Sequence, residues 1–151
     1  MGFRLWRVAV ILAAGAALGL GWNAFSGHGF ALDRSVFIQA GDESIEAAEA
    51  KARLDRGALF LDARPVDFYN MSHIPSSLPL PEPEFDKYFE KLEPKLRATF
   101  NIVIYCAGYG CEASHVVARK LREKGIHAAI LNEGWPAWTD AGYPTKTGTE
   151  P

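Results

Sequence analysis

Three short apolar runs, at residues 58–61, 102–105 and 128–131, constrain the fold more than any other feature of this chain. Each run is long enough for a strand, too short for a core helix, and free of alternating polar residues. This is typical of strands buried on both faces of a parallel sheet. Residues 84–96 and 113–124 carry apolar side chains at helical spacing. The alternation predicts a three-layer α/β domain with a mainly parallel sheet.

Smaller elements complete the expected order. Residues 35–38 are predicted to form a short edge strand. Ser44 is predicted to cap a helix that ends at Gly57. A short helical turn and a proline-rich extended crossing are expected between residues 65 and 83, because proline disfavours both helix interiors and central strands.

The composition indicates one ordinary globular domain. The 151 residues are 48% hydrophobic and 23% charged, which leaves enough apolar mass for a core. The net charge is −2 and no basic run is interleaved with aromatic residues, so nucleic acid is not an expected partner. Two cysteines are too few for a disulfide framework or a zinc site, so neither a metal nor a cofactor is expected.

Residues 1–30 are predicted to be a signal peptide or a signal anchor with its linker. Arg4 and Arg7 precede an apolar run at residues 8–22, and the next ionised side chain is Asp33. Basic residues stay on the cytoplasmic side, so the domain is expected on the periplasmic or extracytoplasmic side of the cytoplasmic membrane. A buried helix of the domain is disfavoured, because the run is apolar on every face.

The sequence leaves open whether this N-terminal segment is cleaved. The small residues Ala24 and Ser26 precede a potential cut before Gly27, which would release the domain into the periplasm. That cut site is a weak match, and Trp6 and Trp22 flank the apolar run as membrane-interface residues do. An uncleaved transmembrane anchor is therefore favoured over a cleaved signal.

Cys106 is predicted to carry the chemistry of the domain. It directly follows the apolar run at 102–105, and ligands of parallel α/β sheets bind beyond the carboxyl ends of central strands. The next residues run into a helix, so their N–H groups can turn toward the sulfur and favour a thiolate or persulfide. This substrate-binding loop consists of Ala107, Gly108, Tyr109, Gly110, Cys111 and Glu112. The alternative is that Cys106 is a small buried apolar residue at a strand end.

Several motifs resemble, in order and spacing, the rhodanese homology domain. They are Leu61-Asp62-Ala63-Arg64, Phe68, His73-Ile74-Pro75, Val103-Ile104-Tyr105-Cys106, Glu133-Gly134-Trp135-Pro136-Ala137-Trp138 and Gly142-Tyr143-Pro144. The resemblance covers residues 35–145 and leaves 146–151 as a tail. It implies a five-stranded, mainly parallel sheet with helices on both faces. It also implies a sulfurtransferase in which Cys106 takes a sulfane sulfur from a small donor and passes it to a thiol acceptor.

Two departures from the family pattern affect the expected substrate and mechanism. Many members carry Arg or Lys in the loop to attract thiosulfate, whereas residues 107–111 hold no cation and Glu112 adds an anion. Thiosulfate is therefore expected to be a poor donor, and phosphatase activity, which needs a loop arginine, is set aside. The second departure is Cys111, a candidate resolving thiol that is expected to form a labile disulfide with Cys106, absent from the reduced resting protein.

Asp62, Arg64 and Ser114 are candidates for supporting the loop. Asp62 and Arg64 end a strand beside it, and are interpreted either as hydrogen-bonding partners of its backbone or as a structural salt bridge. Ser114 is expected to cap the following helix in preference to contacting a bound anion. His73 is expected to make a structural hydrogen bond and not to act as a base.

Three functions from different classes are compatible with these observations. The first is a sulfurtransferase that cycles Cys106 between thiol and persulfide. The second is an exported thiol-disulfide protein in which Cys106 and Cys111 form a reversible bond, since an oxidising compartment favours disulfides. The third is a docking module that has kept the fold and lost turnover. Replacing Cys111 separates the first two, because only the redox protein requires it.

Overall fold

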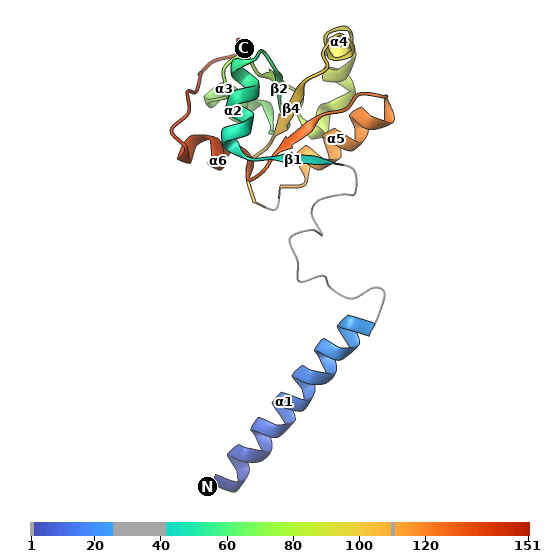
Figure 1. Ribbon diagram of the computed structural model, residues 1–151, viewed down its shortest axis with the longest axis vertical. Helices are drawn as coiled ribbons and strands as arrows, with labels where there is room; N and C mark the ends of the chain where they lie inside the picture. Colours follow the sequence, from blue (N-terminus) through green and yellow to red (C-terminus); the bar gives the residue numbers. More distant parts are fainter. Residues whose placement is uncertain (1, 26–41, 110) are drawn as a thin grey trace. The chain divides into compact units, whose positions relative to one another are not determined.

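The computed structural model describes residues 2–25, 42–109 and 111–151. The chain divides into two compact units, Met1–Val36 and Phe37–Pro151. The first contains helix α1 (Gly2–Phe25) and the second contains all other described elements (Figure 1). These are β1 (Glu43–Ile45), α2 (Ala47–Asp55), β2 (Leu59–Asp62), α3 (Val66–Met71), β3 (Leu78–Pro79), the 3-10 helix η2 (Glu82–Glu84), α4 (Phe85–Arg97), β4 (Ile102–Tyr105), α5 (Ala113–Glu123), β5 (Ala129–Leu131) and α6 (Gly134–Asp140).

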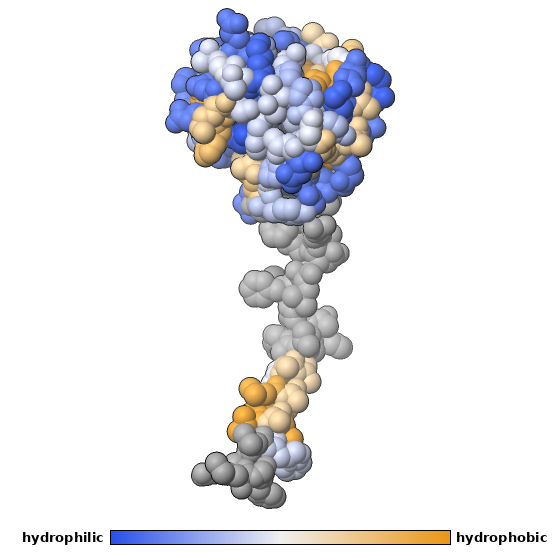
Figure 2. Space-filling model, turned by 90° about the vertical axis from the view of Figure 1, so that its left-hand side faces the viewer, coloured by the Kyte–Doolittle hydropathy of each residue, from blue (hydrophilic) through white to orange (hydrophobic). Residues whose placement is uncertain are grey.

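Helix α1 carries apolar side chains on its surface. Trp6, Leu12 and Leu18 are between 64% and 75% exposed, and the described part of the helix is mostly hydrophobic in Figure 2. Within the described residues, however, no helix has both the length and the apolar character that crossing a membrane requires. The transmembrane anchor expected from the sequence is thus not confirmed. The predicted strand at 35–38 and the potential cut before Gly27 lie outside the described residues.

The sheet of the second unit has five strands in the order β1-β5-β4-β2-β3, and every pairing is parallel. Strand β4 lies at the centre, where Tyr105 pairs with Asp62 of β2 and Ile104 with Ile130 of β5. All residues of β2 and β4 are buried, as expected for parallel strands covered on both faces. The α/β fold with a five-stranded parallel sheet, predicted from the sequence, is confirmed.

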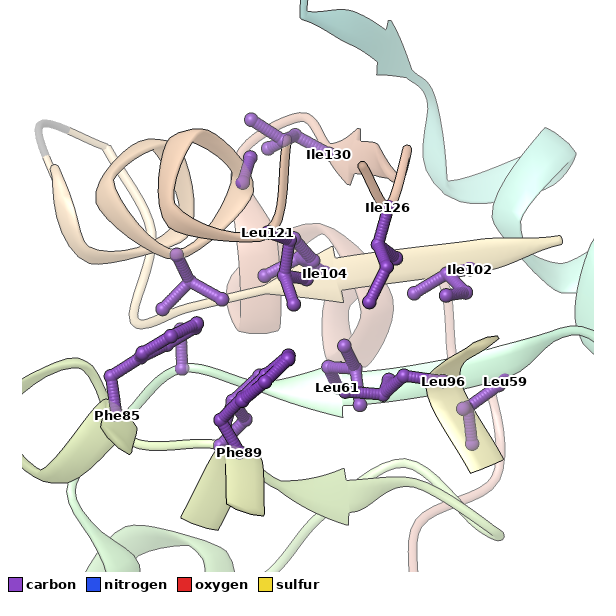
Figure 3. Close-up of a cluster of buried hydrophobic side chains, with 14 of the residues drawn as sticks. Leu59, Leu61, Phe85, Phe89, Leu96, Ile102, Ile104, Leu121, Ile126 and Ile130 are labelled. Atoms are coloured by element: carbon purple, nitrogen blue, oxygen red, sulfur yellow. The ribbon is translucent and has the colours of Figure 1, made fainter. Parts of the chain in front are cut away.

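Helices α4 and α5 cover one face of this sheet (Figure 1). Phe85 and Phe89 of α4 stack with their ring centroids 5.4 Å apart, and they lie near the fully buried Leu121 of α5 in Figure 3. The ammonium group of Lys120, in α5, lies 5.0 Å from the centroid of the Phe85 ring. The ammonium group of Lys124, directly after α5, lies 4.7 Å from the centroid of the Phe89 ring. The apolar faces of the two helices thus meet each other and the sheet, while lysine side chains cover the outer edge.

Helices α2 and α6 cover the opposite face. Trp138 of α6 is fully buried, and its ring meets Phe60 of β2 edge to face with the centroids 5.8 Å apart. The indole N–H of Trp138 donates to the carbonyl oxygen of Pro144 at 2.9 Å, so its one polar group is satisfied inside the domain. The sheet is therefore the middle layer of three.

The prediction that Ser44 caps a helix is wrong. Ser44 lies in β1 and pairs with Ile130 of β5, so strand pairing determines its conformation. Helix α2 begins after Glu46 and ends at Asp55, and Gly57 follows with φ +84°, as predicted for its end. The proline-rich crossing also contains a two-residue strand, β3, where the sequence predicts only an extended segment.

Candidate active site

Cys106 lies at the point where the connections of the sheet change direction. After β2 the chain continues to β3 on one side, and after β4 it continues to β5 on the other. In open parallel sheets, the crevice beyond the carboxyl ends of two such strands is where ligands bind. Asp62 ends β2 and Cys106 directly follows β4, so both lie at the carboxyl ends of these two strands.

A disulfide joins Cys106 to Cys111 across the loop. The two Cα atoms are 6.5 Å apart, within the roughly 4.4 to 6.8 Å that a disulfide spans. Cys106 is 2% exposed and Cys111 is partly buried against the same apolar cluster, on the α4 and α5 side of the sheet. The loop therefore brings the two sulfurs into bonding contact, whereas the lability of the bond and the resolving role of Cys111 remain predictions.

In this disulfide state the backbone N–H of Cys111 does not donate to the Cys106 sulfur. The N–H of Cys111 donates to the carbonyl oxygen of Gly108 at 3.0 Å, and the carbonyl oxygen of Cys111 lies 3.6 Å from the Cys106 sulfur. Ala107, Tyr109 and Glu112 are exposed, and Gly110 is outside the described residues. In the part of the chain described, no group of His, Cys, Asp and Glu side chains is placed to hold a metal ion.

The start of helix α6 braces the Cys106 backbone. The N–H of Trp135 donates to the carbonyl oxygen of Cys106 at 2.8 Å. Gly134 has φ +56°, and a Cβ there would lie 2.3 Å from that same oxygen, so only glycine fits. Pro136 packs against Gly108, where an added Cβ would lie 3.0 Å away. Gly134, Trp135 and Pro136 belong to a motif that carries the family resemblance, but the sequence alone assigns them no role in the site.

Asp62 and Arg64 form a buried ion pair, 0% and 5% exposed. A terminal nitrogen of Arg64 donates to Asp62 Oδ2 at 2.6 Å, and the same group donates to the carbonyl oxygen of Ser72 at 2.7 Å. The Arg64 guanidinium also lies 4.4 Å from the ring centroid of Trp135. The pair is thus a structural salt bridge, one of the two interpretations that the sequence left open. Its guanidinium contacts the ring of Trp135, whose backbone N–H binds the carbonyl oxygen of Cys106.

The prediction that Ser114 caps helix α5 is wrong. The N-cap position belongs to Glu112, which makes no side-chain cap hydrogen bond, and Ser114 is the buried second residue of the helix. The helix therefore begins one residue before Ser114, and the Ser114 side chain in its first turn is buried inside the domain.

Two buried tyrosines and a histidine form a hydrogen-bonded group next to Asp62. The Tyr105 hydroxyl accepts from the N–H of Ile74 at 3.2 Å, and the Tyr69 hydroxyl donates to the carbonyl oxygen of Ser77 at 2.8 Å. Burial, aided by the charge of Asp62, raises the pKa of Tyr69 to about 12 and also raises the pKa of Tyr105. His73 Nδ1 lies 2.9 Å from the carbonyl oxygen of Tyr69, which is the structural hydrogen bond that we expected.

Comparison with known proteins places this geometry in a family. The family profile of the rhodanese-like domain matches residues 46–141. An HTH-type transcriptional regulator of Mycobacterium tuberculosis is 31% identical over 109 residues, which are 71% of this chain and 46% of that protein. The chain thus spans less than half the length of this relative.

Solved structures agree with the family profile. A thiosulfate sulfurtransferase of Pseudomonas aeruginosa is 30% identical with a TM-score of 0.58, over 72% of this chain and 21% of that one. The BH2092 protein of Bacillus halodurans shares the fold with a TM-score of 0.63 at 20% identity, over 76% of this chain and 82% of that one. With the profile match over most of the second unit, these findings show that the chain belongs to the rhodanese-like domain family.

Proposed function

We propose that the domain is a sulfurtransferase in which Cys106 carries sulfane sulfur as a persulfide. The observation that carries this proposal is the position of Cys106 directly after the central strand β4, at the switch point between β2 and β4. The likeness to a thiosulfate sulfurtransferase of Pseudomonas aeruginosa supports the same reaction class.

The proposed reaction has two transfers. The Cys106 thiolate attacks the sulfane sulfur of a donor, the donor fragment leaves with the bonding electron pair, and Cys106 becomes a persulfide. A thiolate acceptor then attacks the outer sulfur and the Cys106 thiolate leaves. The reaction requires the reduced protein, because in the disulfide state Cys106 has no thiolate.

Intact-mass measurement tests the proposal. The reduced Cys111→Ser chain, in which Cys106 is the only cysteine, is incubated with a low-molecular-weight persulfide and is expected to gain the mass of one sulfur atom, which a thiol reductant removes. Cys106→Ser is expected to gain none while keeping the far-ultraviolet circular dichroism of the wild type. A Cys111→Ser chain that gains no sulfur from any donor would point to the docking module.

The charge of the loop suggests the class of donor. Residues 107–111 contain no cation and the exposed Glu112 adds a negative charge, so thiosulfate, a dianion, is disfavoured relative to a thiol persulfide. We expect kcat/KM for thiosulfate to rise in the order wild type, Glu112→Gln, Glu112→Arg, by roughly threefold to tenfold overall at low salt. The value for the persulfide should change much less, and an equal rise for both donors would contradict the electrostatic argument.

A thiol-disulfide exchange protein is the second candidate, and the Cys106–Cys111 disulfide is the observation that favours it. Such a protein would oxidise dithiol substrates with no sulfane donor present, and Cys111→Ser would abolish that activity. A sulfurtransferase would instead need the donor for turnover. Measuring thiol oxidation with and without donor therefore distinguishes the two.

We also propose that the N-terminal segment directs the domain out of the cytoplasm. Arg4 and Arg7 precede an apolar run, and the described side chains of α1 are largely exposed and apolar. A reporter that is active only outside the cytoplasm, fused after Pro151, should be active. Activity of a reporter that functions only in the cytoplasm would contradict this location.

A further inference from the structure

We infer that Cys111 gives the site a second activity, in which the sulfur held on Cys106 is released as hydrosulfide while the two cysteines form a disulfide. The inference rests on the proposed function, because it requires a persulfide on Cys106. It assigns the domain a reaction in which no external acceptor receives the sulfur.

The geometry of the loop carries this inference. Sulfur Sγ of Cys111 is bonded to Sγ of Cys106, the atom to which an outer persulfide sulfur would be attached. The loop therefore permits Cys111 to reach the inner sulfur of a persulfide. The N–H of Cys111 donates to the carbonyl oxygen of Gly108, which closes the loop on itself and holds Cys111 near Cys106. Both side chains contact one apolar cluster, so the attacking sulfur is already inside the domain.

The surroundings of Cys106 favour this internal attack over attack by a bulky acceptor. Cys106 is 2% exposed, and its backbone is held by the N–H of Trp135 at 2.8 Å and enclosed by Gly134. A thiol on the same loop has a high effective concentration, because closing a short loop replaces a bimolecular encounter. The internal thiol is thus the nucleophile that the structure places nearest to the persulfide.

The step balances without an added oxidant. The Cys111 thiolate attacks the inner sulfur of Cys106–S–SH, a Cys106–Cys111 S–S bond forms, and the bond between the inner and outer sulfurs breaks. The outer sulfur leaves as hydrosulfide with the bonding electron pair, and the proton lost from Cys111 goes to solvent. The sulfane sulfur is reduced to sulfide, and the two cysteine thiols are oxidised to the disulfide.

A dithiol reductant then restores the site. Its first thiolate attacks the sulfur of Cys111, which is the more exposed of the two cysteines, and Cys106 leaves as a thiolate. Its second thiol attacks the resulting mixed disulfide and releases Cys111. The net reaction converts a persulfide donor and a dithiol into the donor thiol, hydrosulfide and a disulfide of the reductant.

A single-turnover experiment tests the inference. The full chain is reduced, freed of reductant, and treated with one equivalent of a low-molecular-weight persulfide. Sulfide is then measured together with the alkylatable thiols of the protein. The wild type is expected to release close to one equivalent of sulfide and to lose both thiols together, with the Cys106–Cys111 bond mapped by digestion.

Two variants give the matched controls. Cys111→Ser and Cys111→Ala are expected to retain the added sulfur atom on Cys106 and to release sulfide only when an external thiol is added. Retention of the sulfur by these variants shows that Cys106 is loaded and that they fold. With a dithiol present, the wild type is expected to turn over, whereas Cys106→Ser is not.

The outcomes separate this inference from the proposed function. If the wild type accumulates a stable persulfide while Cys111 remains alkylatable, the release reaction is overturned and sulfur transfer stands. If neither the wild type nor the Cys111 variants acquire sulfur, the proposed function itself fails. If both cysteines are lost without sulfide release, the site is oxidised by another route and the inference is also overturned.

Discussion

At the scale of single residues, Gly134 shows how backbone geometry controls the position of Cys106. Its φ is positive, and a Cβ added to it would lie only 2.3 Å from the Cys106 carbonyl oxygen, which leaves no room for a side chain. That oxygen also accepts the hydrogen bond from the Trp135 N–H. A displaced carbonyl would therefore disturb both the hydrogen bond and the loop that follows Cys106.

Gly134→Ala is expected to lower the rate of sulfur loading on Cys106 by at least about tenfold, because misplacing a reacting group by about 1 Å has effects of this size or larger. It should also lower the free energy of unfolding by more than the roughly 1 kcal/mol of left-handed backbone strain. Gly142→Ala is the matched control, since Gly142 has φ +70° and nothing within 4 Å of an added Cβ. Equal effects of the two substitutions on loading would contradict the bracing role.

Arg64→Ala is expected to lower the free energy of unfolding by about 3 to 5 kcal/mol, because it leaves the fully buried Asp62 carboxylate without its partner. Urea unfolding measures this change. Arg97→Ala is the control, since the Arg97–Glu93 pair is largely exposed and such pairs contribute about 0 to 1 kcal/mol. If both substitutions have the same small effect, Arg64 does not hold this part of the domain together.

At the scale of elements, the edge strand β1 is held by its pairing with β5 and also by charged contacts to α5. The Asp42 side chain, 2% exposed, precedes β1 and accepts from Arg122, and its Oδ2 lies 3.3 Å from Nδ1 of His115. Both partners belong to α5, seven residues apart and thus on one face of the helix. A short strand with three residues benefits from such an attachment.

Asp42→Ala is therefore expected to lower the free energy of unfolding by about 1.5 to 3 kcal/mol, the usual value for hydrogen bonds to a charged group. Hydrogen exchange of the β1 amides should also accelerate more than that of β4. Asp55→Ala removes an exposed ion pair with Lys51 and should change stability by about 0.5 kcal/mol or less. Unchanged exchange in β1 would show that strand pairing alone holds the edge.

The sequence predicts those elements whose identity depends on local pattern. The runs at 58–61 and 102–105 correspond to β2 and β4, and the helices predicted at 84–96 and 113–124 match α4 and α5 within a residue or so at each end. The prediction for Ser44 is wrong because its pairing with β5 involves residues more than eighty positions away, which local spacing does not report.

The distinction between local pattern and contacts of distant segments also applies to the site. The position of Cys106 directly after a buried strand is predictable because it is a local feature. The contact of Gly134 and Trp135 with its carbonyl oxygen joins distant segments, and only the family motif points to it. The link from Arg64 to Trp135 could not be predicted for the same reason.

At the scale of the whole domain, the buried tyrosine hydroxyls connect the sheet to the segments that cover its carboxyl edge. Tyr105, at the end of β4, binds the backbone of Ile74, and Tyr69 of α3 binds the backbone of Ser77. Burial and the charge of Asp62 raise the pKa of both hydroxyls, so they stay neutral to a higher pH in the folded domain than in the unfolded chain. The stability of the folded domain therefore depends on pH at alkaline values.

The sign of this coupling follows from the raised pKa of Tyr69. In the unfolded chain the hydroxyl loses its proton near pH 10, and in the folded domain only near a pKa of about 12. The stabilisation is thus complete below about pH 9. It is lost as the pH rises from about 10 to 12, by about 1.4 kcal/mol per pH unit for each such group. Tyr105 acts in the same direction, since its pKa is also raised.

Tyr69→Phe tests this coupling directly. At pH 7 the variant should be less stable than the wild type by about 1 kcal/mol, because it loses the 2.8 Å hydrogen bond to the Ser77 carbonyl. Above about pH 10 the wild type loses the contribution of Tyr69 and the variant does not, so the difference should shrink and reverse near pH 11. Urea unfolding at a series of pH values up to about 11.5 measures the two curves. A difference that stays constant over this range would show that Tyr69 titrates equally in the folded and unfolded states, and that its burial does not stabilise the neutral hydroxyl.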